Sequence, residues 1–387
     1  MIAYTNYAID ARVRREAETL AAQGFHVRCL TTQNGPERTS FELNGVEVRE
    51  LGVQKYRGKS TKAYIGSYLA FLAHSTAACL RLLTRGELDV LHVHNIPDFL
   101  VFAGLLPRLA GSKIVLDVHD SVPETFATKF ATGGAIQAAL RLEERLSAFV
   151  AHRVICVNHP QRQTLVSRGI PDRKTFISMN VPDPSIFATK QAHEWRRESG
   201  EFNLVYHGTM VRRLGVDLII RAVAELRPRV PGIRLHLWGH GDDLASFQQL
   251  AADLGVGDQV RFRPQGYPLG ELPAQLAAMD LGVVGNRRNA ATDLMLPVKL
   301  MEYASQGIPA VVPRLKTIEY YFADDMVAYY EPDDVASLAG AIERLHRDPQ
   351  RQSRQARRAG EFLQKHGWQH QGVELVNMYQ SLCGESA

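Results

Sequence analysis

Residues 291–312 bring charged side chains to the start of an expected helix. Pro297 suits the first helical turn, where its missing N–H group would be unpaired in any case, and Gly307 is typical of a helix end. The N–H groups at about 296–298 are then free, with the positive end of the helix dipole behind them, which predicts an anion site. Glu302, one turn further in, can accept two adjacent hydroxyls such as those of a ribose. Phosphate and ribose recognition together predict binding of a nucleotide diphosphate.

A second basic loop follows a predicted strand at residues 203–207. Gly208 and Gly215 enclose this loop, and Arg212 and Arg213 place cations beside the start of the next predicted helix. Glycine lets a backbone approach a ligand closely, and arginine binds phosphate through paired hydrogen bonds. This loop therefore also predicts phosphate binding.

Two polar clusters follow predicted parallel strands in the first half of the chain. His94 and Asn95 follow the strand at residues 90–93, and His119 follows the strand at residues 114–118. Open α/β sheets bind their ligands at the carboxyl ends of the strands, so we expect a site there. A histidine in such a place can instead cap the following helix, and this alternative stays open.

Length and patterning predict two α/β domains. The 387 residues, 45% of them hydrophobic, exceed what one core normally holds, and strands alternate with helices throughout, which indicates two doubly wound parallel sheets. The run Met179-Asn-Val-Pro-Asp-Pro184 breaks regular structure, so we expect domains at residues 1–182 and 201–367 with a linker at residues 183–200. No Gly-x-Gly-x-x-Gly follows the first strand, which disfavours a dinucleotide oxidoreductase.

The segment Leu-Pro-Val-Lys-Leu-Met-Glu-Tyr at residues 296–303 is similar to the donor-binding signature of a known family. It resembles the retaining nucleotide-sugar glycosyltransferases of family 4, which have the two-domain GT-B fold. Many members carry two glutamates eight positions apart. Glu302 matches the second glutamate, whereas Leu294 stands in the place of the first with Asp293 beside it, so the group that holds the sugar hydroxyls stays open.

The resemblance implies a role for each residue named above. His119, which would contact the donor sugar, and the cations Arg213 and Lys299, which would bind its pyrophosphate, are the implied catalytic residues. The implied donor-binding residues are Gly208, Thr209, Arg212, Arg263, Asp293, Leu294, Leu296, Pro297 and Glu302. The implied acceptor-side residues are Asn6, Tyr7, His94 and Asn95. A last helix within residues 368–387 would cross back onto the first domain.

The activity that this resemblance implies is sugar transfer from a UDP- or GDP-type donor to a glycan, lipid-linked or small-molecule acceptor. Transfer would retain the anomeric configuration and need neither a cofactor nor a metal, and it would serve cell-surface polysaccharide or glycoconjugate synthesis. Arg213, Lys299 and the helix N–H groups would stabilise the departing diphosphate. Two alternatives remain: a nucleotide-sugar epimerase of the GT-B fold, and a sugar-nucleotide-binding subunit without catalysis.

Charge and hydropathy bear on the partners and the location. A net charge of +4 is too small to predict nucleic-acid binding, but the basic excess lies in the first half, which suits a lipid phosphate or phospholipid headgroups. Residues 55–85 resemble an apolar helix with basic ends, which could either lie on a membrane surface or pack in the core. The four scattered cysteines, and the lack of a signal peptide or a continuous membrane-spanning stretch, predict a cytoplasmic protein, with contact to the inner face of the membrane as one option.

Overall fold

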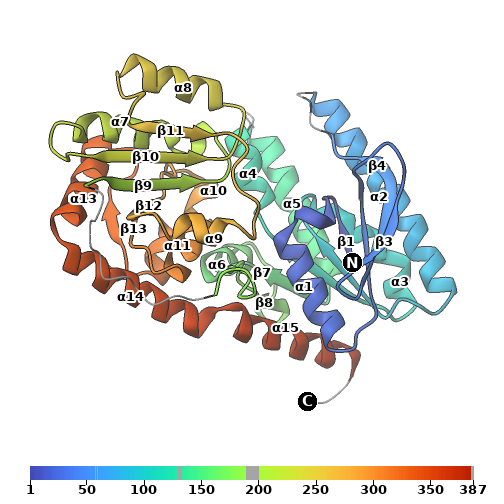
Figure 1. The fold of residues 1–387 in the computed structure, drawn as a ribbon. Helices are drawn as coiled ribbons and strands as arrows, with labels where there is room; N and C mark the ends of the chain where they lie inside the picture. The colour runs from blue at the N-terminus through green and yellow to red at the C-terminus, as the bar shows by residue number, and fades with distance from the viewer. Residues whose placement is uncertain (57, 59, 130–132, 189–199, 385–387) are drawn as a thin grey trace. The chain divides into compact units, whose positions relative to one another are not determined.

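A computed structural model describes the chain except for residues 57, 59, 130–132, 189–199 and 385–387. It divides into two compact units, one comprising Met1–Asn180 with His370–Ala387 and the other Val181–Gln369. Each unit is a mainly parallel sheet with helices packed around it (Figure 1), so the predicted α/β fold class with two doubly wound sheets is confirmed. The expected linker was residues 183–200, of which 189–199 lie outside the described residues.

The first unit, over its described residues, contains eight strands in the order β3-β4-β2-β1-β5-β6-β7-β8, paired in parallel except for the antiparallel pair β3–β4. The strands are β1 (Ile2–Ala3), β2 (Val27–Gln33), β3 (Ser40–Leu43), β4 (Val46–Gln54), β5 (Val90–His94), β6 (Lys113–Val118), β7 (Arg153–Cys156) and β8 (Thr175–Ile177). The helices are η1 (Tyr7–Ile9), α1 (Ala11–Ala22), α2 (Thr61–Thr84), η2 (Asp98–Gly104), α3 (Leu105–Leu109), α4 (Val122–Lys129), α5 (Gly134–Val150), α6 (His159–Ser167), η3 (Asp172–Lys174) and α15 (Trp368–Cys383).

The second unit, over its described residues, contains six parallel strands in the order β11-β10-β9-β12-β13-β14. The strands are β9 (Phe202–His207), β10 (Ile233–Trp238), β11 (Val260–Arg263), β12 (Leu281–Val283), β13 (Ala310–Pro313) and β14 (Ala328–Tyr330). The helices are η4 (Arg212–Leu214), α7 (Val216–Leu226), α8 (Leu244–Asp253), α9 (Leu272–Leu276), α10 (Ala290–Asp293), α11 (Val298–Ser305), α12 (Lys316–Tyr321), α13 (Val335–Arg347) and α14 (Pro349–His366).

Local sequence explains where the site-bearing helix begins and ends. Pro297 is the residue before α11 (φ −64°, ψ 121°), so the helix starts one residue later than predicted. The amide of Leu300 already donates to the Pro297 carbonyl at 3.0 Å. The free N–H groups are therefore those of Val298 and Lys299 rather than those of residues 296–298. Gly307, with φ of +70°, ends the helix as predicted.

The sequence analysis did not predict strand β3. Strand β3 pairs with β4 in antiparallel fashion through a turn at Asn44 and Gly45, whose φ angles are 51° and 77°. Two consecutive left-handed residues of the Asn-Gly type are a strong hairpin signal. Because this hairpin lies at the edge of the first sheet, the omission does not affect the site.

The apolar helix α2 packs on the first sheet with one side only. Tyr68, Phe71 and Cys79 are buried in the core, whereas Ile65 and Leu69 are 49% and 53% exposed. No continuous membrane-spanning stretch was predicted, but within the described residues the segment Lys62–Thr84 is long and apolar enough to cross a membrane by length and composition. Core helices of soluble proteins meet the same criterion, so this observation is weak evidence by itself.

Both sheets have a point at which the strand order reverses. In the second unit, β9 lies between β10 and β12, so the loops after β9 and β12 leave the sheet in opposite directions. In the first unit, β1 lies between β2 and β5. Open α/β sheets bind ligands at the carboxyl ends of strands next to such a point. Gly208 follows β9 at one of these points, and at the other Asn6 follows β1 and His94 ends β5.

Candidate active site

Lys299 lies at the start of α11, beside the loop that follows β9. Its Nζ atom is 3.6 Å from the ring centroid of Tyr206 and 3.6 Å from the position that a Cβ atom on Gly208 would occupy. Gly208 has a φ of +110°, and glycine both adopts this conformation and leaves room for the lysine. Lys299 therefore reaches the loop backbone at the carboxyl end of the strand.

Burial lowers the pKa of Lys299 to about 7, with the Glu302 carboxylate opposing this shift and the Arg213 guanidinium reinforcing it. Within the described residues, neither Lys299 nor Arg213 forms an ion pair with a carboxylate. The Glu302 carboxylate does not offset burial and the Arg213 charge together, so a dianionic diphosphate would stabilise this arrangement. The structure thus brings together the two basic residues that the sequence singled out.

His207 and Glu302 line the same pocket as Gly208. The Nε2 atom of His207 is 3.3 Å from Oε2 of Glu302, without hydrogen-bond geometry. Burial, with a further contribution from Lys299, lowers the pKa of His207 to about 3, so its imidazole is neutral. A neutral imidazole and a carboxylate side by side offer a hydrogen-bond donor and acceptors to a hydroxylated ligand.

A pocket of about 580 Å³ opens at this place in the second unit. It is lined by His207, Gly208, Thr209, Val211, Trp238, Gly239, His240, Gly241, Asp242, Gly266, Tyr267, Leu269, Leu272 and Glu302. A Cβ atom on Gly239 would lie 2.2 Å from the Gly208 carbonyl oxygen, and one on Gly241 would lie 2.4 Å from the Met210 carbonyl oxygen. The glycines therefore let two loops come together and form the pocket wall.

Arg263, an implied donor-binding residue, lies next to the pocket rather than among its lining residues. Its guanidinium stacks on Tyr267, 4.0 Å from the ring centroid, and its Nε donates to the Gly266 carbonyl at 2.8 Å. Gly266 and Tyr267 both line the pocket. Arg263 thus holds the residues that could contact a base, and direct contact stays a prediction.

Four predicted donor-binding residues lie in the segment before α11, and their surroundings differ. Asp293 accepts a long hydrogen bond of 3.4 Å from the Lys316 amide, and its carbonyl accepts the Thr317 hydroxyl at 2.7 Å, so it fixes the start of α12. Leu296 and Pro297 are largely buried. Leu294 ends α10 and has no group that could bind a sugar hydroxyl through its side chain. The part of Asp293 in donor binding therefore stays a prediction.

Arg212 and Thr209 are exposed. The Arg212 amide donates to Asp243 at 2.7 Å, and the Arg212 carbonyl accepts from Arg287, so the loop backbone is held while its side chain stays in solvent. Thr209 lines the pocket, and its carbonyl accepts the Tyr206 hydroxyl at 2.7 Å. These hydrogen bonds fix the loop backbone at Thr209 and Arg212, while the Thr209 side chain stays exposed.

In the first unit, His119 lies at the end of β6 and is held by Asp117. Its Nε2 atom is 2.8 Å from Oδ2 of Asp117. Burial alone would lower the pKa of His119, but the Asp117 carboxylate outweighs this effect and raises it. With 23% of its side chain exposed, His119 can still reach a ligand.

His94 and Asn95 support His119 from the neighbouring strand. The Nδ1 atom of His94 lies 3.0 Å from Nε2 of His119, and the Asn95 side-chain oxygen accepts the His119 amide at 2.7 Å. His94 is 1% exposed, and burial lowers its pKa to about 4. This burial disagrees with the predicted acceptor contact of His94, because the interior position suits a positioning role instead. Asn95, 7% exposed, has the same positioning role.

The other acceptor-side predictions fall on η1 and its cap. The Asn6 side chain accepts the Ala8 amide at 3.0 Å and so starts η1. Tyr7 is 1% exposed, and burial raises its pKa, so the hydroxyl faces the interior. Tyr7 therefore does not present its side chain to an acceptor in this structure, while Asn6 stays a prediction.

Beneath His119 lies a buried ionic network that the sequence analysis did not foresee. Arg12 donates to both oxygens of Asp117 at 2.9 and 2.8 Å and lies 3.0 Å from Glu16. Burial raises the pKa of Glu16 to about 7, although Arg12 opposes this shift. The Nδ1 atom of His92 lies 2.6 Å from the Tyr379 hydroxyl of α15. Helix α1, strands β5 and β6 and the final helix thus share one polar core.

This network includes four side chains whose ligand atoms lie within 4.8 Å of one another, namely Glu16, His92, His94 and Asp117. The geometry does not fit a metal centre. His92 and His94 are stacked, with centroids 4.2 Å apart and planes at 20°, so their in-plane lone pairs do not converge. Arg12 already neutralises the carboxylates. Metal independence of the reaction itself stays a prediction.

Comparison with known proteins gives the family. Residues 8–179 match the family described as "Glycosyl transferase 4-like domain", and residues 201–348 match "Glycosyl transferases group 1". Sucrose-phosphate synthase from Thermosynechococcus elongatus superposes with a TM-score of 0.80 at 18% identity, covering 100% of this chain and 98% of that one, and shares the fold. The chain belongs to the GT-B glycosyltransferases.

Two curated relatives of this glycosyltransferase are informative. One is the GDP-mannose-dependent alpha-(1-6)-phosphatidylinositol monomannoside mannosyltransferase of Mycolicibacterium smegmatis, 35% identical over 145 residues. This match covers 37% of the present chain and only 38% of that enzyme, less than half of its length. The other is the D-inositol 3-phosphate glycosyltransferase 1 of Catenulispora acidiphila, 26% identical over 397 residues, which cover 97% and 90% of the two chains.

The sequence of this glycosyltransferase contains a pattern from which part of the buried ionic network could have been predicted. Residues two apart on a strand share a face, so His92 with His94, and Asp117 with His119, form two pairs on adjacent strands. The observed register places His94 opposite Asp117. Parallel pairing of the two predicted strands would therefore have predicted the contact. The contribution of Tyr379, 287 residues away from His92, had no local signal.

Proposed function

We propose that this glycosyltransferase uses a nucleoside-diphosphate sugar as donor and transfers the sugar with retention of configuration and without a metal. One observation carries the proposal: Lys299 in the first turn of α11 lies near Arg213 of η4, and the positive charge of each disfavours that of the other, while within the described residues neither forms an ion pair with a carboxylate. Glu302 lies one turn further along α11 and lines the adjoining pocket. A diphosphate matches the basic residues Lys299 and Arg213, and a hydroxylated sugar or ribose matches Glu302.

The chemistry follows from charge. When the glycosidic bond to the donor breaks, negative charge grows on the diphosphate, and fixed cations that lie beside it lower the energy of the transition state. The N–H groups of Val298 and Lys299 add the positive end of the α11 dipole. In the absence of donor, the pKa of Lys299 is about 7, and the incoming diphosphate would raise it. The lysine would thus take up its full charge when the donor binds.

Retention is proposed from the family resemblance of residues 296–303 and of the loop at residues 208–215. In that scheme the acceptor attacks from the face that the diphosphate leaves, and a diphosphate oxygen accepts the acceptor's proton. His119, held by Asp117, would donate a hydrogen bond to a hydroxyl of the donor sugar, the contact that the resemblance implies. The configuration of the product, measured by NMR of the anomeric proton, tests retention directly. An inverted product would refute it.

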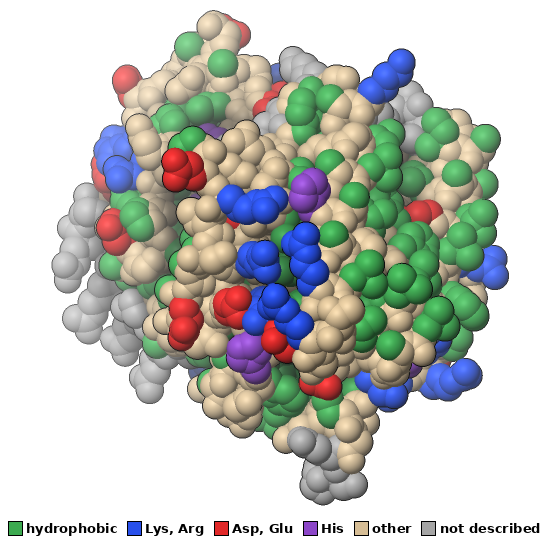
Figure 2. All heavy atoms as spheres, turned by 90° about the vertical axis from the view of Figure 1, so that its right-hand side faces the viewer, with side chains coloured by type: hydrophobic (Ala, Val, Ile, Leu, Met, Phe, Trp, Pro, Cys, Tyr) green, Lys and Arg blue, Asp and Glu red, His purple; other side chains and the backbone are tan. Residues whose placement is uncertain are grey.

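For the acceptor we propose a lipid-linked sugar or polyol at an anionic membrane surface. Large apolar side chains are exposed on three helices of the first unit: Ile65 and Leu69 on α2, Leu105, Leu106 and Leu109 on α3, and Ile136, Leu142, Leu146 and Phe149 on α5. Figure 2 shows a face on which hydrophobic side chains gather, with lysine and arginine side chains among them. Exposed Lys55 and Lys62 flank the start of α2. Apolar side chains with basic neighbours favour anionic lipid surfaces.

Donor use is tested with purified protein and a panel of nucleoside diphosphates and nucleotide sugars. A matching diphosphate should raise the melting temperature, and the Lys299→Met variant should lose this rise. Sugar transfer should continue in the presence of a chelator. An epimerised donor formed without acceptor, or binding without any turnover across acceptors, would contradict the proposed transfer.

Membrane contact is tested by co-sedimentation with vesicles of phosphatidylglycerol and phosphatidylcholine. We expect binding to the anionic vesicles only, and we expect the double variant Ile65→Ser, Leu69→Ser to bind at least tenfold more weakly. Ala73→Ser, at another exposed position of α2, is the matched control. Equal binding of all three proteins would refute the assigned surface.

A further inference from the structure

A small pocket rich in arginine lies between helix α2 and strands β2 and β4 of the first unit. Its volume is about 260 Å³, and its lining residues are Arg28, Leu30, Arg49, Ala78, Arg81, Leu82 and Arg85. Arg28 is the second residue of β2, so the pocket lies toward the amino-terminal ends of the strands, away from the carboxyl ends that carry His119. None of the functions argued above uses this pocket.

The strand register places two of the arginines on the face of the sheet that α2 covers. Arg28 and Leu30 are two residues apart on β2, and side chains at this spacing share a face. Leu30 is paired with Arg49 of β4, so Arg49 lies on the same face. Leu30 packs in one hydrophobic cluster with Ala78 of α2. Strands β2 and β4 thus form one wall of the pocket, opposite α2.

Helix α2 brings two further arginines to the pocket from the other side. Its four lining residues have the spacing i, i+3, i+4 and i+7 of a single helix face, namely Ala78, Arg81, Leu82 and Arg85. Ala78 and Leu82 are buried. Arg81 and Arg85 are exposed. The pocket therefore has apolar residues inside and arginines on the side that solvent reaches.

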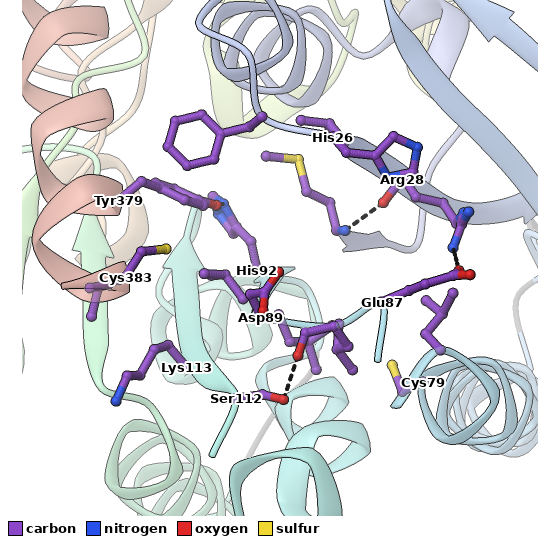
Figure 3. A pocket seen from close by; sticks show the side chains of 18 of the residues that line it. His26, Arg28, Cys79, Glu87, Asp89, His92, Ser112, Lys113, Tyr379 and Cys383 are labelled. Carbon is purple, nitrogen blue, oxygen red and sulfur yellow. Dashed lines mark hydrogen bonds and ion pairs between the residues drawn. The ribbon is translucent and has the colours of Figure 1, made fainter. Parts of the chain in front are cut away.

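Carboxylates balance only part of this positive charge. Arg28 pairs with Glu47 at 2.7 Å and with Glu87 at 3.1 Å. Figure 3, a view of the larger neighbouring cavity that Arg28 also lines, shows its side chain directed toward Glu87. The other three arginines of the pocket form no ion pair with a carboxylate in the part of the chain that the structure describes. Four arginines and two glutamates leave a net charge of +2.

Stabilisation of the helix end does not account for all of these arginines. Arg81 lies in the last turn of α2, where a cation stabilises the negative end of the helix dipole. Arg49 lies on a strand and is half-buried, so it has no such role. Like charges from two elements around one pocket repel each other. An anion between Arg49 and Arg81 would replace this repulsion by attraction to both.

We propose that this arginine pocket binds a phosphate monoester as its dianion. Near pH 7 such a group carries a charge of about −1.5 to −2 and has three strong acceptor oxygens. These features match the net charge of +2 and guanidinium groups that come from β2, β4 and α2. The volume of about 260 Å³ is below the range of about 300–1,000 Å³ for drug-sized ligands, so the ligand is a phosphate with few further atoms inside the pocket.

The bound phosphate would link α2 to the sheet, and this role is independent of the proposed donor and acceptor. The phosphate monoester can belong to a soluble molecule or to a phospholipid headgroup, and both present the same group to the arginines. Glycerol 3-phosphate contains this group and is the probe for the pocket itself.

The test titrates the full-length protein with glycerol 3-phosphate in a calorimeter. We expect saturable binding, and we expect the double variant Arg49→Gln, Arg81→Gln to lower the affinity by a factor of about ten or more, because charge-assisted hydrogen bonds are lost. The matched control Arg141→Gln, Arg145→Gln removes the same charge from exposed positions of α5 and should bind like the wild type. Melting curves without ligand show whether each variant is folded.

The Lys299→Met variant separates this pocket from the proposed donor site. It should bind glycerol 3-phosphate like the wild type, and Arg49→Gln, Arg81→Gln should keep the stabilisation by a matching nucleoside diphosphate. Three results would overturn the proposal: no saturable binding to the wild type, loss of binding in Lys299→Met alone, or an equal loss in both arginine double variants. The last result would indicate attraction by the overall charge instead of a site.

Vesicles distinguish a lipid phosphate from a soluble one. Phosphatidic acid contains a phosphate monoester, whereas phosphatidylglycerol contains a diester. Tighter binding to phosphatidic acid at matched surface charge, with this preference lost in Arg49→Gln, Arg81→Gln, would support the pocket and assign its ligand to a lipid. Equal binding to both kinds of vesicle, together with binding of glycerol 3-phosphate, would support the pocket and assign its ligand to a soluble ester.

Discussion

Replacing Lys299 by methionine tests the donor site most directly. Methionine keeps an unbranched side chain of similar length but removes the charge, so it can still pack over the Tyr206 ring. A hydrogen bond to a charged group contributes about 1.5–3 kcal/mol, which corresponds to roughly 10- to 150-fold in affinity or rate. We therefore expect kcat/KM for the donor to fall by this factor.

The pH dependence gives a second, independent expectation. Because the pKa of Lys299 is about 7 in the free protein, its charged form is lost as the pH rises through this value. If that form binds the diphosphate, kcat/KM should fall up to tenfold per pH unit above about 7, since kcat/KM reports the free enzyme. The Lys299→Met variant should lack this limb. Arginine remains charged, so Lys299→Arg should also lack it while keeping part of the activity.

The pH dependence of stability distinguishes loss of the Lys299 charge from damage to the fold in the Lys299→Met variant. The folded pKa of Lys299 lies below the ordinary value of 10.5, so the unfolded chain binds a proton that the folded chain releases. The wild-type protein should therefore gain stability as the pH rises from 7 toward 10.5, and this gain should be absent in Lys299→Met. The assay is donor-dependent transfer between pH 6 and 9 with melting curves on the same samples. Unchanged kcat/KM in a folded Lys299→Met protein would refute the reasoning.

Three further predictions concern residues other than Lys299. Asp117→Asn should lower the pKa of His119 and reduce kcat at least tenfold, as measured by NMR titration and turnover. Glu302→Gln should weaken binding of the matching nucleotide sugar about tenfold, or about 1.4 kcal/mol, in a calorimetric titration, and an unchanged Kd would remove Glu302 from the site. Gly239→Ala should lower the melting temperature and abolish donor binding, because its Cβ atom would lie 2.2 Å from the Gly208 carbonyl oxygen at a φ of +124°. Gly257→Ala, with no atom within 4 Å of the new Cβ, should behave like the wild type.

Local patterns in the sequence were sufficient to predict the fold and the part of the candidate site that lies in the second unit. Alternating strands and helices gave the two sheets, and the spacing of Lys299 and Glu302 from Pro297 put both on α11. The contact of Lys299 with Gly208 depends on which strands are neighbours, but both residues had already been singled out for phosphate.

The remainder depended on pairings that no local pattern contains. Asp117 was interpreted only as part of a buried strand, because its role requires the register between β5 and β6. Tyr7 lies in a segment whose composition is polar, and its inward orientation follows from packing. Gly239 and Gly241 carry no side-chain chemistry, so their value as a contact surface for another loop appears only in three dimensions.

The first unit is discontinuous in sequence, and this has a consequence for synthesis on the ribosome. Tyr379 completes the polar core by bonding to His92, and the Gln371 side chain accepts the Met179 amide at 3.0 Å. Domains form as units while the chain emerges, and the amino-terminal one usually forms first. Here the earlier-made unit is completed by residues of α15, which are made after the whole second unit, whereas residues 181–369 are contiguous. The hydrogen bond between His92 and Tyr379 can therefore form only after the second unit has been made.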